Sequence, residues 1–223
     1  DLHSFPTRRS SDLTRAGWDV LGVLTNLASD KSPVVRAAVA QSAARLARAG
    51  QDNTPIVQIL LRQPGAADDP MLSQLIWYAA EPLIAKNPAP LLDELATPDL
   101  LTHAGPIVPR SIARRLYTSG DDKLMQPLFA CLRANKDKPI TTVMLDGILA
   151  GHKNFITAPA NGEALTGDLA KSANKEVVAK AKQLATVWGA KASVASALKI
   201  LTNSKAPEPD RAASLKLLRG NKS

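Results

Sequence analysis

The sequence predicts an all-α protein, and three observations lead to that prediction. Hydrophobic residues make up 45% of the 223 residues but aromatic residues only 4%, and this Ala- and Leu-rich balance suits closely packed helices better than sheets. Breaker-free segments of about 8 to 17 residues follow one another, and many begin with proline, which fits the first turn of a helix. The turns between them are short, so consecutive helices are expected to pack antiparallel.

The first half of the chain shows a start or stop signal at most of its expected helices. Ser32-Pro33 opens the first helix and Gly50 ends it, Pro64-Gly65 ends the second, and Asp69-Pro70 opens the third. The third carries an apolar stripe of helical period as far as Leu83. The expected helices are residues 34–49, 55–62, 70–83, 88–96 and 106–117, with a loop at residues 97–105.

The second half continues in the same way. Asp121 is the expected cap of one helix, and prolines open two others. A strand-like run from Ile140 to Met144 lies in surroundings that favour a helix, and residues 157–162 form the clearest loop. The expected helices are residues 121–134, 139–150, 163–171, 175–188, 190–201 and 207–218.

The first 13 residues are expected to differ in origin from the rest of the chain. Residues 1–13 (DLHSFPTRRSSDL) resemble the in-frame translation of a short-read sequencing adapter. We therefore expect residues 1–13 to be a non-native, disordered segment and residues 14–223 to be one helical-repeat domain, itself an incomplete fragment. A targeting signal cannot be read from such an N-terminus.

Similar segments begin several of the expected helices. Pro33-Val-Val-Arg-Ala-Ala, Glu176-Val-Val-Ala-Lys-Ala and Pro209-Asp-Arg-Ala-Ala are alike, and aligning Val178 with Asp210 gives a spacing of 32 residues. The pattern Asp30-x-x-Pro-Val-Val-Arg-x-x-Val-Ala resembles the first helix of a HEAT repeat. This resemblance implies a right-handed α-solenoid of stacked antiparallel helix pairs, an armadillo-like superhelix in which each pair buries its apolar face against the next.

A narrower resemblance extends over residues 14–223. Asp68-Asp-Pro with Leu75-Ile-Trp-Tyr and Glu81-Pro, Ile112-Ala-Arg-Arg-Leu, and Val178 with Leu184-Ala-x-x-x-Gly are similar to the helical-repeat region of large exported proteins of planctomycetes and verrucomicrobia. In that family a membrane-bound dehydrogenase-like β-propeller and a c-type cytochrome accompany the repeats. The resemblance implies a periplasmic or exported redox parent with haem c in a missing domain, but no family catalytic or haem residue has a counterpart here.

The segment around Trp77 contains the most distinctive residues. Pro82 removes a backbone amide and should kink or end the helix beside Trp77 and Tyr78. A ligand notch formed by the kink, Trp77 and Glu81 is one interpretation; an architectural role is favoured, with a buried Glu81 paired to an arginine of the next repeat. The residues predicted to be architectural are Trp77, Tyr78, Glu81, Pro82, Arg114 and Arg115.

The net charge of +8 is concentrated in the last quarter of the chain. Residues 171–223 contain 11 Lys and Arg against three acidic residues, whereas the charges of residues 1–170 cancel. A lysine-rich solvated face is the favoured interpretation; binding of an anionic partner such as nucleic acid is the alternative. The candidate anion-binding residues are Lys175, Lys180, Lys182, Lys191 and Lys199.

Sequence signals for chemistry are absent. The lone Cys131 excludes an internal disulfide and a C-x-x-C-H haem site. His3, His103 and His152 have no second ligand at helical spacing, and no phosphate-binding glycine motif or nucleophile elbow occurs. We therefore expect no catalytic residue, metal or cofactor in this fragment, and no apolar run is long enough to span a membrane.

The function expected from these observations is a non-catalytic scaffold or protein-interaction module, with protein or neighbouring domains of the same chain as partners. A nucleic-acid-binding repeat protein that uses residues 171–223 is the alternative, and its lysines should converge on one face. An enzyme that acts through a lost cofactor domain is the third hypothesis.

Overall fold

The computed structural model describes residues 19–152 and 158–220, with the exception of the side chains of residues 191, 192 and 220. Within these residues all regular secondary structure is helical and there is no strand, which confirms the all-α prediction. The chain divides into two compact units, residues up to 108 and residues from 109 onward, and each unit is described by itself. The predicted non-native segment, residues 1–13, lies outside the described residues.

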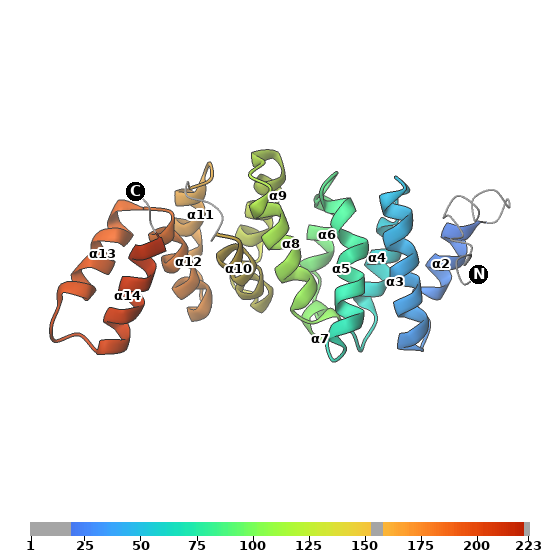
Figure 1. Ribbon diagram of the computed structural model, residues 1–223, viewed down its shortest axis with the longest axis horizontal. Coiled ribbons are helices and arrows are strands. Elements are labelled where there is room, and N and C mark those ends of the chain that lie inside the picture. Colours follow the sequence, from blue (N-terminus) through green and yellow to red (C-terminus); the bar gives the residue numbers. More distant parts are fainter. Residues whose placement is uncertain (1–18, 153–157, 221–223) are drawn as a thin grey trace, which may run out of the picture. The chain divides into compact units, whose positions relative to one another are not determined.

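The helices of the first unit form two layers. Helices α3 and α5 lie side by side in one layer, and α4 and α6 lie behind them in the second (Figure 1). The bounds are α2 (Val20–Leu27), α3 (Pro33–Arg48), α4 (Thr54–Arg62), α5 (Pro70–Ile84), α6 (Ala89–Leu95) and α7 (Leu100–Ala104). Helices α2, α3 and α4 each pack against the next helix in sequence and against the helix after that.

Small side chains allow α3 and α5 to approach closely. The buried face of α3 contains four alanines among its apolar residues, and Ala79 and Ala80 are fully buried on α5. Pro33 and Pro70 occupy the first turns of the two helices, and the Asp69 carboxylate accepts hydrogen bonds from the amides of Met71 and Leu72.

Buried polar groups tie the connecting segments of the first unit together. Arg36, on the buried face of α3, donates to the carbonyl oxygens of Asp30 and Pro64, each at 2.8 Å. The Glu94 side chain is 2% exposed and accepts two hydrogen bonds from the guanidinium of Arg62. A buried carboxylate needs such a bidentate partner because burial removes its hydration.

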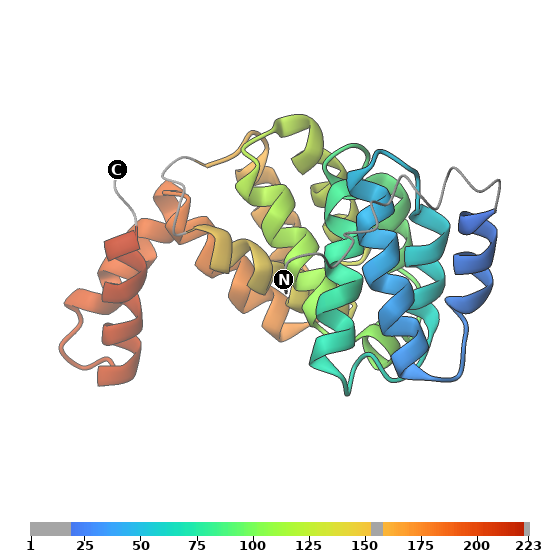
Figure 2. The same ribbon diagram turned by 45° about the vertical axis from the view of Figure 1, so that its right-hand side comes forward.

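The second unit repeats the same packing pattern. Helix α9 packs against α11, α10 against α12, and α12 against both α13 and α14. The last two helices form an antiparallel hairpin, which Figure 2 shows side by side. The bounds are α8 (Ile107–Thr118), α9 (Asp122–Ala134), α10 (Pro139–Gly151), α11 (Gly162–Leu169), α12 (Lys175–Val187), α13 (Lys191–Thr202) and α14 (Glu208–Gly220).

A glycine brings α10 into close contact with α8. A Cβ atom placed on Gly147 would lie 2.2 Å from the carbonyl oxygen of Arg110 and 3.1 Å from the amide nitrogen of Arg114. Since real Cβ atoms do not approach backbone atoms this closely, only glycine permits the observed approach.

Three local expectations differ from the structure. The expected loop at residues 97–105 contains the short helix α7, which starts after Asp99 in the left-handed conformation. Helix α2 has no counterpart among the expected helices. Helix α5 runs through Pro82 to Ile84, so this proline does not end it; a proline so near a helix end removes only one of the last backbone hydrogen bonds.

Candidate functional site

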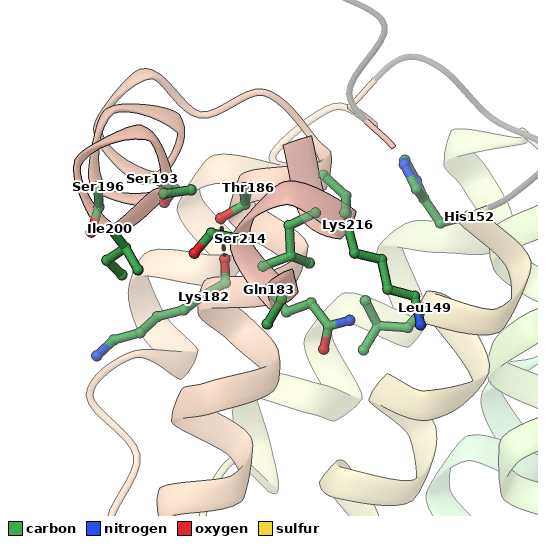
Figure 3. A pocket seen from close by; sticks show the side chains of 14 residues that line it. Leu149, His152, Lys182, Gln183, Thr186, Ser193, Ser196, Ile200, Ser214 and Lys216 are labelled. Atoms are coloured by element: carbon green, nitrogen blue, oxygen red, sulfur yellow. Dashed lines mark hydrogen bonds between the residues drawn. The ribbon is translucent and has the colours of Figure 1, made fainter. Parts of the chain in front are cut away.

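In the second unit an open groove lies between α10, α12, α13 and α14, with a volume of about 690 Å³. We call it the C-terminal groove (Figure 3). This volume falls within the range of ligand-binding clefts in proteins. The groove is lined by Leu149, His152, Lys182, Gln183, Thr186, Val187, Ser193, Ser196, Ala197, Ile200, Ala213, Ser214, Lys216 and Leu217.

Small side chains on α13 create the hollow. Ser193, Ser196, Ala197 and Ile200 have the spacing i, i+3, i+4 and i+7, which places them on one face of the helix. Three of the four are too small to fill the space between α13 and α12. The face that a core helix would fill with large apolar residues is therefore open at this position.

Exposed apolar side chains occur on both helices of the hairpin. Ile200, which lines the groove, is 39% exposed. Leu198 and Leu215 are 47% and 45% exposed, but helical spacing places them on the sides of α13 and α14 that face away from the lining residues. Single exposed apolar side chains of this kind are normal on protein surfaces.

The charged residues that line the groove are both lysines. Lys182 lies on α12 and Lys216 on α14, and neither forms an ion pair with a described residue. Figure 3 shows their side chains pointing away from each other. The groove therefore combines an apolar floor with positive charge at two separate places.

A buried polar network adjoins one end of the groove. The indole Nε1 of Trp188 donates to the phenol oxygen of Tyr117 at 2.9 Å, and this oxygen is hydrogen-bonded to Nδ1 of His152 at 3.0 Å. The His152 residue is 7% exposed, and its Nε2 has no hydrogen-bond partner among the residues that the structure describes. The ring centroids of Tyr117 and Trp188 are 6.1 Å apart and those of Phe129 and Trp188 are 6.3 Å apart, distances typical of tilted aromatic packing.

Burial determines the protonation of this network. It lowers the pKa of His152, because the apolar surroundings disfavour the charged imidazolium. It also raises the pKa of the Tyr117 hydroxyl, and the hydrogen bond from Trp188 opposes that rise. At neutral pH both groups are therefore uncharged, as a buried structural network requires.

The five candidate anion-binding lysines do not form one cluster around the groove. Lys182 lines it, whereas Lys175 and Lys199 are exposed and do not line it. Lys180 is paired with the Asp146 carboxylate at 2.5 Å. The side chain of Lys191 lies outside the described residues.

The predicted architectural residues fall into both units. Tyr78 is 42% exposed and lines a small crevice between α3 and α5 with Arg45 and Arg48, of about 200 Å³. Trp77 and Pro82 are half-buried on α5.

The predicted ion pair involves residues of different units. Glu81 belongs to the first unit and is half-buried; Arg114 and Arg115 belong to the second, the former exposed and the latter half-buried. The pairing of Glu81 with these arginines stays a prediction.

Sequence reasoning did not find the groove or the network beside it. The sequence pattern places Tyr117 and Trp188 only at the ends of expected helices, and it presents His152 only as a histidine without a second metal ligand at helical spacing. One signal was present: Ser193, Ser196 and Ala197 are small residues at positions where a core-facing helix usually carries large ones.

The described residues contain no candidate metal centre. Among residues 19–152 and 158–220, no group of three or more His, Cys, Asp or Glu side chains is placed to hold a metal ion. None of the helices in this part of the chain has the length and apolar character needed to cross a membrane.

Comparison with known proteins assigns no family. No family model matches the chain, and no curated protein or solved structure is significantly similar to it. A functional conclusion therefore depends on the packing and on the groove.

Proposed function

We propose that this chain is a non-catalytic helical-repeat scaffold, a HEAT-like α-solenoid that presents surfaces to a protein partner or to neighbouring domains. One observation carries the proposal: within each unit, side-chain hydrogen bonds recur between residues about one helix pair apart. The separations are 32 residues for Arg62–Glu94, 31 for Ser73–Ala104, 35 for Arg133–Asp168 and 34 for Lys180–Asp146.

This regular step supports a repeat architecture for a physical reason. A helix pair of about 30 to 40 residues cannot bury its own apolar face and must pack against the next pair. Residues that form hydrogen bonds between helices then lie about one repeat apart along the chain, whichever side chains form the bond. The backbone bond from Ala67 to the His103 carbonyl, 36 residues apart, follows the same step.

Small-angle X-ray scattering of residues 14–223 tests the solenoid. We expect a radius of gyration clearly above the roughly 17 Å of a compact domain of this length, because stacked pairs extend in one direction. A value close to that of a compact domain would contradict the proposal.

We further propose that the scaffold belongs to a larger exported redox protein, as the resemblance of Asp68-Asp-Pro, Leu75-Ile-Trp-Tyr and Glu81-Pro implies. Recovery of the upstream reading frame from genomic DNA tests this parent. We expect a β-propeller and a C-x-x-C-H motif in the same frame. A frame without either would overturn the proposed parent but not the scaffold.

Retention on heparin separates the scaffold from the nucleic-acid alternative. A nucleic-acid-binding surface would hold the protein on heparin to well above physiological salt, since phosphate contacts release counterions. We expect elution at low salt, because Lys180 is paired and Lys182 borders an apolar groove.

A further inference from the structure

We infer that the C-terminal groove binds an acidic amphipathic helix of a partner protein. The occupant's apolar side chains would lie in the groove, and its carboxylates would contact Lys182 and Lys216. This inference deepens the proposed scaffold function, because it names the chemical class of the partner.

The shape of the groove requires an apolar occupant. Its walls include Leu149, Val187, Ile200 and Leu217, and the small face of α13 leaves room for side chains from outside. Association that covers such surface is favourable in proportion to the apolar area removed from water.

The spread of the lining favours a polypeptide over a small molecule. The lining residues come from four helices, α10, α12, α13 and α14. A helix lying across them can fill the hollow with side chains from successive turns, as amphipathic helices do in apolar grooves.

Charge selects an acidic occupant. No acidic side chain lines the groove, and Lys182 and Lys216 are the charged residues that do. Since their side chains point away from each other (Figure 3), a single anionic headgroup cannot contact both. Carboxylates spaced along a helix can, and complementary charge also speeds association.

The test uses the whole chain and a fluorescein-labelled synthetic peptide of about 15 residues, a length at which a helix becomes marginally stable. Its leucines stand at i, i+3, i+4 and i+7, and glutamates fill most other positions. Fluorescence anisotropy measures binding. We expect saturable binding, and none for a peptide of the same composition in scrambled order. Equal binding of the scrambled peptide would overturn the proposal, because attraction would then be merely electrostatic.

Two double variants locate the contact. The change Lys182→Glu with Lys216→Glu should weaken binding about tenfold, as expected for removal of two interfacial charge contacts. The matched control, Lys175→Glu with Lys205→Glu, removes the same charge from exposed residues that do not line the groove. It should change binding less than about twofold. Equal losses in both variants would contradict the site.

A filling variant tests the groove itself. Ser196→Trp places a large side chain from an exposed lining position into the hollow. It should abolish binding, with an unchanged circular dichroism spectrum. Unaltered binding by Ser196→Trp would overturn the groove as the site.

Two other occupants would also overturn the inference. Displacement of the peptide by laurate at equal concentration would assign the groove to a small amphipathic anion. A dimer in sedimentation experiments that the same Ser196→Trp change dissociates would assign it to a second copy of the chain. The scattering test of the solenoid does not involve the groove, so the two proposals can fail separately.

Discussion

The indole of Trp188 donates a hydrogen bond to the phenol oxygen of Tyr117 across 71 residues of sequence. That separation is close to twice the 35 residues between Tyr117 and His152, which the same oxygen also joins. The network thus connects the C-terminal ends of α8, α10 and α12. Its members are buried and largely uncharged, so their main role is to hold these helix ends in place.

Loss of the Tyr117 hydroxyl should therefore destabilise the fold. Tyr117→Phe leaves the Trp188 indole and His152 Nδ1 without their shared partner, at a cost of about 1–3 kcal/mol in the free energy of unfolding. Urea denaturation followed by circular dichroism measures it. Tyr78→Phe, on an exposed ring, is the control and should change stability by less than about 0.5 kcal/mol. Equal effects would show that the network contributes nothing.

Replacement of Arg36 should have a similar effect in the first unit. Arg36→Met keeps the apolar stem but removes the hydrogen bonds to the Asp30 and Pro64 carbonyls, so we expect a loss of about 2–4 kcal/mol. Arg48→Met changes an exposed arginine of the same helix and should be nearly neutral. The comparison of their urea midpoints checks the prediction; coincident midpoints would contradict it.

Two glycine-to-alanine changes should have opposite outcomes. Gly147→Ala forces its new methyl group against the Arg110 carbonyl, and we expect at least about 2 kcal/mol of destabilisation. Gly167→Ala meets nothing within 4 Å and lies inside α11, so it should raise stability by up to about 1 kcal/mol. Thermal melting of both variants measures the difference. A stable Gly147→Ala variant would mean that α8 and α10 can separate at little cost.

Stability should depend on pH through His152. Burial lowers the pKa of His152 in the folded protein, so below the ordinary value of 6.5 the unfolded chain binds a proton that the folded protein does not. The free energy of unfolding should therefore fall from about pH 6.5 downward, until the folded-state pKa is reached. Above pH 6.5 both states are neutral at this residue, and the effect should vanish.

The variant His152→Gln isolates this contribution. Denaturation curves between neutral pH and the onset of carboxylate titration should lose the slope that His152 causes. His103→Gln replaces a half-buried histidine of the first unit and should retain that slope. A slope that persists in His152→Gln would assign it to another group.

Much of the helical pattern could be predicted because its causes are local. The expected helix at residues 34–49 is observed as Pro33–Arg48, and that at 175–188 as Lys175–Val187. Prolines, caps and glycines act on their own turn of the helix, so the sequence reveals them directly. Helix α7 was missed because it is one turn long and begins at a left-handed Asp99.

The candidate site was predicted less well. The excess of lysine in residues 171–223 favoured a solvated face, with an anionic partner as the alternative, but it did not show that Lys180 is paired with Asp146 while Lys182 borders a groove. Nor does the pattern of its helix show that Arg36 is 5% exposed and donates to the carbonyl oxygens of Asp30 and Pro64. Such differences depend on residues about 30 positions away, which periodicity does not identify.

By itself the sequence determined that this chain is helical and where most of its helices begin and end, because those features depend on neighbouring residues. Only the tertiary structure decided which polar groups are buried, how closely Gly147 lets α10 approach α8, and that small residues of α13 leave a groove. These features depend on contacts between side chains of different helices. Residues that are distant in sequence come into contact only when the chain has folded.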